Sequence, residues 1–405
     1  MSDRRRGAAR ACGALLALLL AAFLAGCGGD GGDAANSGGS GTLGVSLTDA
    51  PACGFDAVNV AVRQVRVHQS AAAAGSAGGW SEITLQPARK INLLDLTNGV
   101  LEHLGETALP AGHYTQLRLM LSANDASNPF RNSVVRSSGS GAQLALTTPS
   151  AVQTGIKLVH GFDVPAGERV DLVLDFDACK SVVALGNGSF LLKPVVKAIP
   201  STFNGIRGFV HANLLGSNVM VSAQTNGTIV RATVPDLSTG AFVLARLGAG
   251  NYDVVLTAED RAAAVIVAVP VESSGVVAIS TEADPIVLPV SATRTIGGNA
   301  TLDPPGAADE AVVVAARQAF GGGPTVTVKW QAADLLTGAY ALTLPVGAPL
   351  LGTYLVGGTL PIPLDPQVAL AGRYTVEASA SGYQTRSIGR DISAANAIQG
   401  FVLVP

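Results

Sequence analysis

The sequence predicts an all-β protein of tandem β-sandwich domains, and three observations support this prediction. Apolar and polar residues alternate over runs such as 58–67 and 170–176, which is the strand pattern. Asn-Gly pairs at 187–188 and 226–227 indicate turns, the first inside a predicted hairpin. Long helical periodicity is scarce, and 91–104 leaves open a short helix or a turn-rich excursion.

The N-terminus has the pattern of a secretory signal. An apolar run of about 15 residues, shorter than the roughly 20 that span a bilayer, follows four arginines. It ends at Leu24-Ala25-Gly26-Cys27, which resembles the lipobox of bacterial lipoproteins. The resemblance implies cleavage before Cys27 and acylation of Cys27 with lipid such as palmitate. An ordinary signal peptide with a chance cysteine is the alternative.

The residues after Cys27 bear on location. In lipoproteins an Asp after the acylated Cys favours the inner membrane, and here the residue is Gly28. The resemblance therefore implies the outer membrane, with the protein facing the periplasm or the cell surface. Residues 28–41 have no apolar residue larger than Ala, which predicts a flexible tether.

Composition bounds the partners and the domain count. The chain has 26 basic and 29 acidic residues, and removing the signal makes it more acidic, so no nucleic-acid partner is expected. Hydrophobic residues make up 48% and charged residues 14%, enough for several cores. We predict a signal peptide (1–26), an acylated tether (27–41) and three sandwiches (42–200, 205–290 and 294–405).

Two short motifs repeat in the C-terminal half. Thr239-Gly240-Ala241-Phe242 returns as Thr337-Gly338-Ala339-Tyr340, and Ala249-Gly250-Asn251-Tyr252 returns as Ala371-Gly372-Arg373-Tyr374. The second copy has a Pro/Gly-rich insert at 345–366 between its motifs. These repeats resemble carboxypeptidase-regulatory-like domains of the transthyretin type, which implies spacer or binding modules. A third Ala-Gly-x-Tyr at 111–114 predicts a shared local turn.

The first predicted domain carries several motifs in order. They are Ser46-Leu47-Thr48-Asp49-Ala50-Pro51, Ile91-Asn92-Leu93-Leu94-Asp95-Leu96, Pro110-Ala111-Gly112-His113-Tyr114, Leu174-Asp175-Phe176-Asp177 and Leu192-Lys193-Pro194-Val195. Their order resembles a domain of unknown function found in bacterial lipoproteins. The resemblance implies a β-sandwich in the cell envelope and transfers no catalytic residue.

Two cysteines remain after Cys12 leaves with the signal and Cys27 is acylated. We expect Cys53 and Cys179 to pair in an oxidising compartment. The bridge would close a loop of about 126 residues, worth roughly 4–5 kcal/mol in the chain-entropy model. Two separate buried thiols are the alternative, and ligand spacing for a metal is absent from the sequence around both cysteines.

Asp175 and Asp177 are the best candidates for chemistry. Residues i and i+2 of a strand share a face, so the two carboxylates converge while Phe176 packs on the other side. With Asp49 they form a weak candidate calcium site that lacks several oxygens. A solvated strand end with a turn-capping Asp is the simpler interpretation.

The other chemistry-bearing residues are scattered. The five histidines lack ligand spacing, and the sequence contains no hydrolase, Walker or EF-hand motif. Trp80, after the small-residue stretch 70–79, and Trp330 are sugar-stacking candidates, although core positions are more common for Trp.

We therefore expect a non-enzymatic, lipid-anchored envelope protein for binding or structural presentation, with a membrane partner and an envelope-protein or glycan ligand. A carbohydrate-binding accessory lipoprotein of a surface polysaccharide system is one alternative. An unrecognised hydrolase that uses Asp175 and Asp177 is the other.

Overall fold

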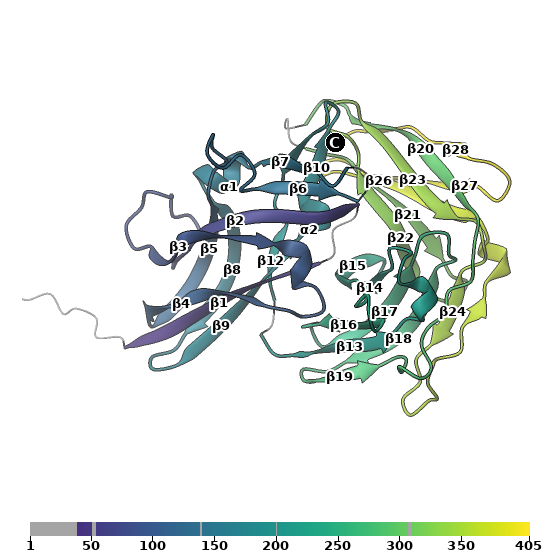
Figure 1. The fold of residues 1–405 in the computed structure, drawn as a ribbon, viewed down its shortest axis with the longest axis horizontal. Coiled ribbons are helices and arrows are strands. Elements are labelled where there is room, and N and C mark those ends of the chain that lie inside the picture. Colours follow the sequence, from purple (N-terminus) through teal and green to yellow (C-terminus); the bar gives the residue numbers. More distant parts are fainter. Residues whose placement is uncertain (1–38, 51–53, 138–139, 200, 307–309) are drawn as a thin grey trace, which may run out of the picture. The chain divides into compact units, whose positions relative to one another are not determined.

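Strands make up almost all the regular structure of the described residues, which confirms the predicted all-β class (Figure 1). The structure is a computed structural model, and it describes residues 39–50, 54–137, 140–199, 201–306 and 310–405. The predicted signal, Cys27 and most of the tether lie outside these residues, as does Cys53. No helix in the described ranges is long and apolar enough to cross a membrane.

The first sandwich packs a four-stranded sheet on an eight-stranded sheet. The four-stranded sheet has the order β12 (Val196–Ile199), β9 (Arg169–Asp177), β1 (Ser40–Ala50) and β4 (Glu102–Pro110). The other has the order β10 (Val182–Leu185), β11 (Ser189–Leu192), β7 (Gln143–Thr147), β6 (Ser133–Arg136), β2 (Phe55–His68), β5 (Gly112–Leu121) and β8 (Ile156–Val164), and β3 (Ser81–Asn92) also pairs with β2. Three short helices complete it: η1 (Leu93–Leu96), α1 (Pro149–Gln153) and α2 (Ala178–Ser181).

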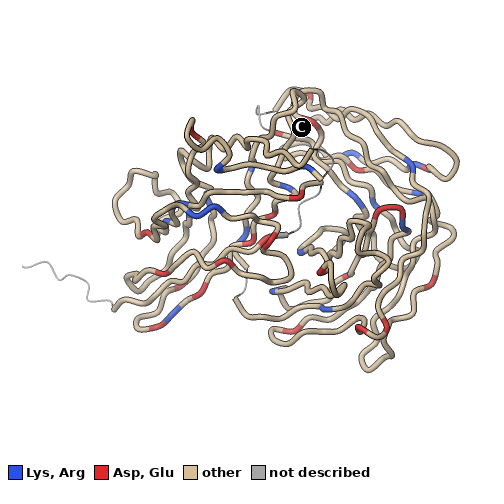
Figure 2. The backbone as a smooth tube through the Cα atoms, viewed as in Figure 1, with Lys and Arg blue, Asp and Glu red and all other residues tan. Residues whose placement is uncertain are grey.

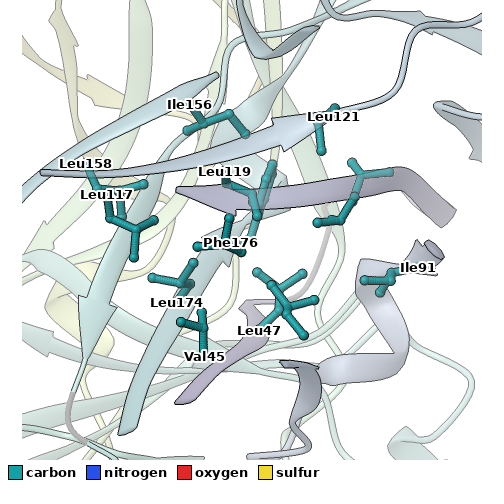
Figure 3. Close-up of a cluster of buried hydrophobic side chains, with 14 of the residues drawn as sticks. Val45, Leu47, Ile91, Leu117, Leu119, Leu121, Ile156, Leu158, Leu174 and Phe176 are labelled. Atoms are coloured by element: carbon teal, nitrogen blue, oxygen red, sulfur yellow. The ribbon is translucent and has the colours of Figure 1, made fainter. Parts of the chain in front are cut away.

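Alternation along the strands builds the core between these sheets. Leu174 and Phe176 of β9 meet Leu117 and Leu119 of β5, and all four are almost fully buried (Figure 3). Burying such a side chain stabilises the fold by about 1.5–3 kcal/mol. A register shift between Val62 and Gln64 interrupts the pairing of β2. The hairpin at Asn187-Gly188 joins β10 to β11, as predicted.

The second sandwich combines a three-stranded sheet with a six-stranded one. The first has the order β16 (Ala241–Ala245), β13 (Asn204–Phe209) and β19 (Gly275–Ala278). The second has the order β15 (Thr228–Thr233), β14 (Met220–Thr225), β17 (Gly250–Thr257), β18 (Ala264–Val271), β24 (Leu350–Thr353) and β25 (Asp365–Pro366). The short helix η2 (Ala212–Leu214) follows β13.

The third sandwich has two four-stranded sheets. One contains β23 (Ala339–Pro345), β20 (Thr293–Leu302), β28 (Ala397–Ile398) and β29 (Phe401–Leu403). The other has the order β22 (Thr325–Ala332), β21 (Val313–Ala319), β26 (Arg373–Ser379) and β27 (Arg386–Asp391). The short helix η3 (Val368–Leu370) precedes β26.

The boundary between the second and third sandwiches differs from the prediction. The insert at 345–366 contributes β24 and β25, and β24 extends the six-stranded sheet by pairing in parallel with β18. Leu350 and Ile362 of this insert lie in the core of the second sandwich. Part of the predicted third domain therefore belongs structurally to the second.

The six-stranded sheet is buried on both faces in its centre. Val254 and Ile266 face the core of the second sandwich, while Val255 and Val265 lie in the core of the third. Burial on both faces explains why β18 is a continuous apolar run and lacks strict alternation.

Candidate functional site

The two predicted carboxylates of β9 do share a face. Leu174 and Phe176 point into the core, so Asp175 and Asp177 project from the opposite side of the strand and line one crevice. The crevice lies where the three sandwiches meet, because Met220 and Trp330 also line it. The spacing of the two aspartates therefore predicted their convergence correctly.

Asp175 is committed to an ion pair with Arg231 of β15. Both side chains are only 7% exposed. Burial raises the pKa of Asp175 above its ordinary value, and the Arg231 guanidinium opposes this shift while the Asp177 charge adds to it. The pair joins the first sandwich to the second, and removing one partner would leave a buried charge uncompensated.

Asp177 caps the short helix that follows β9. Its Oδ1 accepts from the Lys180 backbone N–H at 3.0 Å, and its Oδ2 lies 2.6 Å from Lys180 Nζ. The same Nζ lies 5.6 Å from the centre of the Trp330 ring, within cation–π range. Asp177 is therefore a helix cap, as the simpler interpretation predicted, but the strand end is not solvated, because Asp175 is buried. Trp330 gains a contact between sandwiches.

The crevice is small. It offers about 20 Å³ to the centres of water-sized molecules, which is enough for about one water. Asp175 and Asp177 already bind cationic side chains of the protein. The arrangement can hold sandwiches together, and it has no room for a sugar or peptide.

Asp49 does not line the crevice of Asp175 and Asp177, and it bonds to a different group. It is buried on β1, and its Oδ1 accepts from the Ala178 backbone N–H at 2.9 Å. Asp49 therefore anchors the start of α2. In the part of the chain that the structure describes, no group of three or more His, Cys, Asp and Glu side chains is placed to hold a metal ion.

The predicted disulfide and lipid sites fall largely outside the described residues. Cys179 lies in α2 beside the crevice. Cys53 and Cys27 lie outside the described ranges, so the Cys53–Cys179 bridge and the acylation of Cys27 stay predictions.

Trp80 stands directly before β3 and contacts cationic side chains. The guanidinium carbons of Arg66 and Arg118 lie 4.7 Å and 5.0 Å from its ring centre, and the His68 ring is 5.0 Å away. Its Nε1 donates to the Ala74 carbonyl at 3.0 Å. Trp80 thus helps to fasten the small-residue loop to the sheet.

The same loop is tied down by buried polar side chains. The Gln116 amide donates to three loop carbonyls, and Arg118 donates to the Ala73 carbonyl at 3.0 Å. Gln116 is fully buried beneath the loop. A stretch with no large apolar side chain is therefore held by hydrogen bonds from the sheet.

The five histidines serve separate local roles or lie exposed. His113 Nδ1 lies 2.7 Å from Asp163 Oδ1 at the surface, and His211 Nδ1 accepts from the Asn213 backbone N–H. His68 contacts the Gly78 carbonyl. The structure brings no three of them together within the described ranges.

Asn98 makes a contact between sandwiches that the sequence did not reveal. Its Nδ2 donates to the Val234 carbonyl at 2.8 Å, and its Oδ1 accepts from the Val243 backbone N–H at 3.0 Å and from the Thr233 hydroxyl. Between β15 and β16, the Asn98 side-chain amide thus takes the place of backbone hydrogen-bond partners. The Asn98-Gly99 pair, with both φ angles positive, was the available signal, but it indicated only a turn.

Gln224 plays the same part between the second and third sandwiches. It is fully buried, its Nε2 donates to the Thr327 carbonyl at 2.7 Å, and its Oε1 accepts from the Thr327 backbone N–H at 2.8 Å. The Thr327 hydroxyl donates to the Gly227 carbonyl at 2.7 Å. Gln224 shares β14 with Ser222 and Thr225, so its polar side chain alone did not signal this contact in the sequence.

Comparison with known proteins supports one assignment. Residues 40–194 match the family model described as "Domain of unknown function (DUF4382)", which confirms the expectation of an uncharacterised domain at this end. A search of curated proteins finds no match.

Solved structures align only loosely. The Bacillus anthracis TIE protein is 11% identical, with 90% of this chain and 50% of that chain covered and a TM-score of 0.18. The Corynebacterium diphtheriae major pilin SpaA is 12% identical (90% and 99% covered, TM-score 0.19), and a streptococcal ancillary pilin is 10% identical (90% and 99%, TM-score 0.16). The chain spans half the length of the TIE protein. TM-scores this low do not establish a shared fold.

Proposed function

We propose that this chain is a non-enzymatic, lipid-anchored protein of the bacterial cell envelope, whose sandwiches act as a structural spacer that presents loops for binding. The lipobox-like Leu24-Ala25-Gly26-Cys27 supports the anchor. Gly28 supports the outer membrane, and the periplasmic and surface orientations are both compatible with the sequence.

The observation that carries the spacer role is the way in which the sandwiches are joined. Asn98 and Gln224 each use a side-chain amide to complete backbone hydrogen bonding in a neighbouring sandwich. The Asp175–Arg231 pair adds a buried ionic contact at the first of these junctions. Fixed junctions of this kind hold modules at constant spacing, as a spacer requires.

The two alternative functions gain less support. The crevice beside Asp175 and Asp177 has room for about one water, which disfavours a hydrolytic centre there. Each tryptophan ring lies near a cationic side chain of the protein, which gives both a role within the fold. We retain the carboxypeptidase-regulatory-like assignment of the two repeats as part of the proposal.

The anchor is tested with the full chain in a Gram-negative host grown with radiolabelled palmitate. The wild-type protein should be labelled and remain with the membrane, whereas Cys27→Ala should be unlabelled. Cys12→Ala is the matched control, because this cysteine precedes the proposed cleavage point and should change neither result. An unlabelled wild-type protein would refute the lipid anchor. Protease treatment of whole cells would reveal the orientation of a labelled one.

The spacer role is tested by loosening the junctions. Asn98→Ala combined with Gln224→Ala should make the segments between the sandwiches more sensitive to limited proteolysis, while Asn213→Ala, at an exposed position, should not. Equal proteolysis of the wild-type chain and both variants would contradict fixed junctions.

The predicted disulfide has its own test. Mass spectrometry of an unreduced digest should show a peptide that joins Cys53 to Cys179, and free thiols at both would exclude the bridge.

A further inference from the structure

The edge strand β27 of the third sandwich is open to an added strand. It is the last strand of its sheet, and among the described residues it pairs with β26 on one side only (Figure 1). Every residue of β27 is exposed except Arg390, which is half-buried. The outer edge of an end strand presents unpaired backbone N–H and C=O groups, which can pair with another chain.

The register with β26 shows which backbone groups of β27 point outward. The Ile392 N–H donates to the Gly372 carbonyl at 2.8 Å, which continues the antiparallel pairing of β27 with β26. Because these groups alternate in direction along an antiparallel strand, the N–H and C=O groups of Ser387 and Gly389 point away from β26. A Cβ at Gly389 would meet open space, and β27 contains no proline. Another backbone can therefore approach this edge.

The side chains beside this edge combine an apolar centre with positive charge. Arg386, Ile388 and Arg390 share one face of β27, and it is the core face, because Ile388 lies opposite the buried Val376. Arg386 makes no ion pair within the described residues. The Arg390 guanidinium donates to the Gln399 side-chain oxygen, a neutral partner. Neither arginine therefore has its charge cancelled.

The acidic residue of β27 does not offset these charges. Asp391 lies on the opposite face of the strand, where its Oδ2 is 3.3 Å from Arg373 Nε. Its Oδ1 also accepts from the Ser393 backbone N–H at 2.9 Å. The core face of this edge is thus locally basic, although acidic residues outnumber basic ones in the whole chain.

A second copy of this chain fits the edge poorly. In an antiparallel pair, opposite residues either both bond across the pair or both point away from it, so Ser387 or Gly389 must face one of these two residues of the other copy. The registers with the most overlap place Arg386 opposite or diagonal to Arg390 of the other copy. Like charges at these positions destabilise the pair, so the missing negative charge must come from a different chain.

We propose that the outer edge of β27 binds an extended acidic segment of a partner protein, which joins the sheet as one more strand. The segment has the pattern acidic-x-apolar-x-acidic, so its apolar side chain packs on Ile388 and its carboxylates meet Arg386 and Arg390. Backbone bonds with Ser387 and Gly389 hold the segment, while the alternate side chains provide selectivity. Its addition also covers the side chain of Ile388, which is 37% exposed.

The test measures the binding of the fluorescein-labelled peptide Thr-Glu-Thr-Val-Thr-Glu-Thr to the full chain by fluorescence anisotropy. This peptide should bind. The same peptide with lysine in place of both glutamates should not, because like charges then meet at the edge. A peptide with proline in place of valine should not bind either, because proline interrupts an added strand. Amide hydrogen exchange at Ser387 and Gly389 should slow when the first peptide is bound.

Two variants separate the charge from the backbone. Arg386→Glu should weaken binding of the first peptide about five- to tenfold, because it turns an attraction into a repulsion. Ser387→Pro removes an outward N–H, and a proline is tolerated there because that N–H faces solvent, so it should weaken binding by about as much. Arg207→Glu is the matched control: it reverses an exposed arginine of the second sandwich and should change binding by less than about twofold.

Several outcomes would overturn the proposal. Equal binding of the glutamate and lysine peptides would remove the charge argument, and absence of binding by the glutamate peptide would remove the partner. Slower exchange in another strand would place the site elsewhere. A dimer of the chain that Ser387→Pro dissociates would assign the edge to a second copy. These results depend neither on the lipid anchor nor on the junctions between sandwiches, so they are independent of the proposed spacer role.

Discussion

The second and third sandwiches use the same loop and differ in the segments that come after it. In the second, the carboxylate of Asp236 accepts from the backbone N–H groups of Ser238 and Thr239, and Gly240 N donates to the Asp236 carbonyl at 2.8 Å. In the third, Asp334 accepts from Leu336 and Thr337 in the same way, and Gly338 N donates to its carbonyl at 2.7 Å. The repeat seen in the sequence is thus a repeat of hydrogen-bond geometry.

The tyrosines of the second motif diverge. The Tyr252 hydroxyl donates to the carbonyl of Gly248, four residues earlier, and Tyr114 of the first sandwich does the same with Pro110. The Tyr374 hydroxyl instead donates to the Pro345 carbonyl at 2.5 Å. Pro345 is the first residue of the insert, so the Tyr374 bond holds the start of the segment that contains β24. Both repeats therefore have a tyrosine hydroxyl that donates to a carbonyl, and the acceptor differs between them.

The largest effect is expected from Leu350, which the insert places in the core of the second sandwich. Leu350→Ala should lower the free energy of unfolding by about 2–5 kcal/mol. Hydrogen exchange should rise first in the second sandwich and only later in the third. Leu355→Ala is the matched control, because this leucine of the same insert is 68% exposed and its loss should change stability by less than about 0.5 kcal/mol. Faster exchange confined to the third sandwich would show that the insert belongs to its own domain.

The next effect concerns the glycines that close the repeated loops. Gly240 and Gly338 have φ angles of 73° and 69°, and a Cβ at Gly240 would meet the Val210 carbonyl oxygen at 2.3 Å. Gly240→Ala and Gly338→Ala should each cost about 1–3 kcal/mol in urea denaturation. Gly240→Ala should be the worse, since the corresponding contact at Gly338 is 2.7 Å. Gly216→Ala, where a Cβ meets open space, is the control, and a similar cost there would contradict the geometric argument.

Removal of the tyrosine hydroxyls should have a smaller effect. Tyr252→Phe and Tyr374→Phe should each cost about 1 kcal/mol, because each leaves a carbonyl without its donor. Tyr374 should cost more, since it is more deeply buried and its bond is shorter. Burial also raises the pKa of both phenols, so an ultraviolet titration should show both ionising above pH 10. Tyr383→Phe is the comparison, because this half-buried tyrosine makes its hydrogen bond, to the Pro304 carbonyl, at the surface, and equal costs for all three would remove the distinction.

The smallest effect is a dependence on acid. The Ser238 hydroxyl and the Thr239 backbone N–H hold the pKa of Asp236 at about 2, below its ordinary 3.8. A carboxyl with a depressed folded pKa adds stability above pH 4, and that stability is lost as the pH falls toward 2. Asp236→Asn should therefore flatten the stability curve in this window. Ser238→Ala should also reduce the change in this window, because it removes the hydroxyl that donates to Asp236, and an unchanged curve would argue against the role of the serine.

Local patterns predicted much of the fold. Alternation placed β2 and β9 of the first sandwich, Asn187-Gly188 gave its hairpin, and the spacing of Asp175 and Asp177 gave their shared face. These features depend on residues close in sequence. Figure 2 likewise shows acidic and basic residues spread along the described backbone, as composition suggested.

Contacts between distant segments escaped prediction. The pairing of β24 with β18 depends on how an insert folds back, and nothing in its Pro/Gly-rich composition specifies the strand that it joins. The partners of Asp175 and Asn98 come from another sandwich, so spacing along the chain could not reveal them. A side-chain amide in a strand indicates that a polar group needs a hydrogen-bond partner, but it does not identify that partner.

The strand β24 also has a consequence for the history of this chain. Because the last repeat lends a strand to the sheet of the one before it, neither can be excised, duplicated or exchanged alone without leaving an open sheet edge. We therefore expect the two repeats to be inherited together as a pair. A recombination breakpoint between 290 and 350 should be selected against, whereas one near residue 200 would leave both sheets of the pair whole.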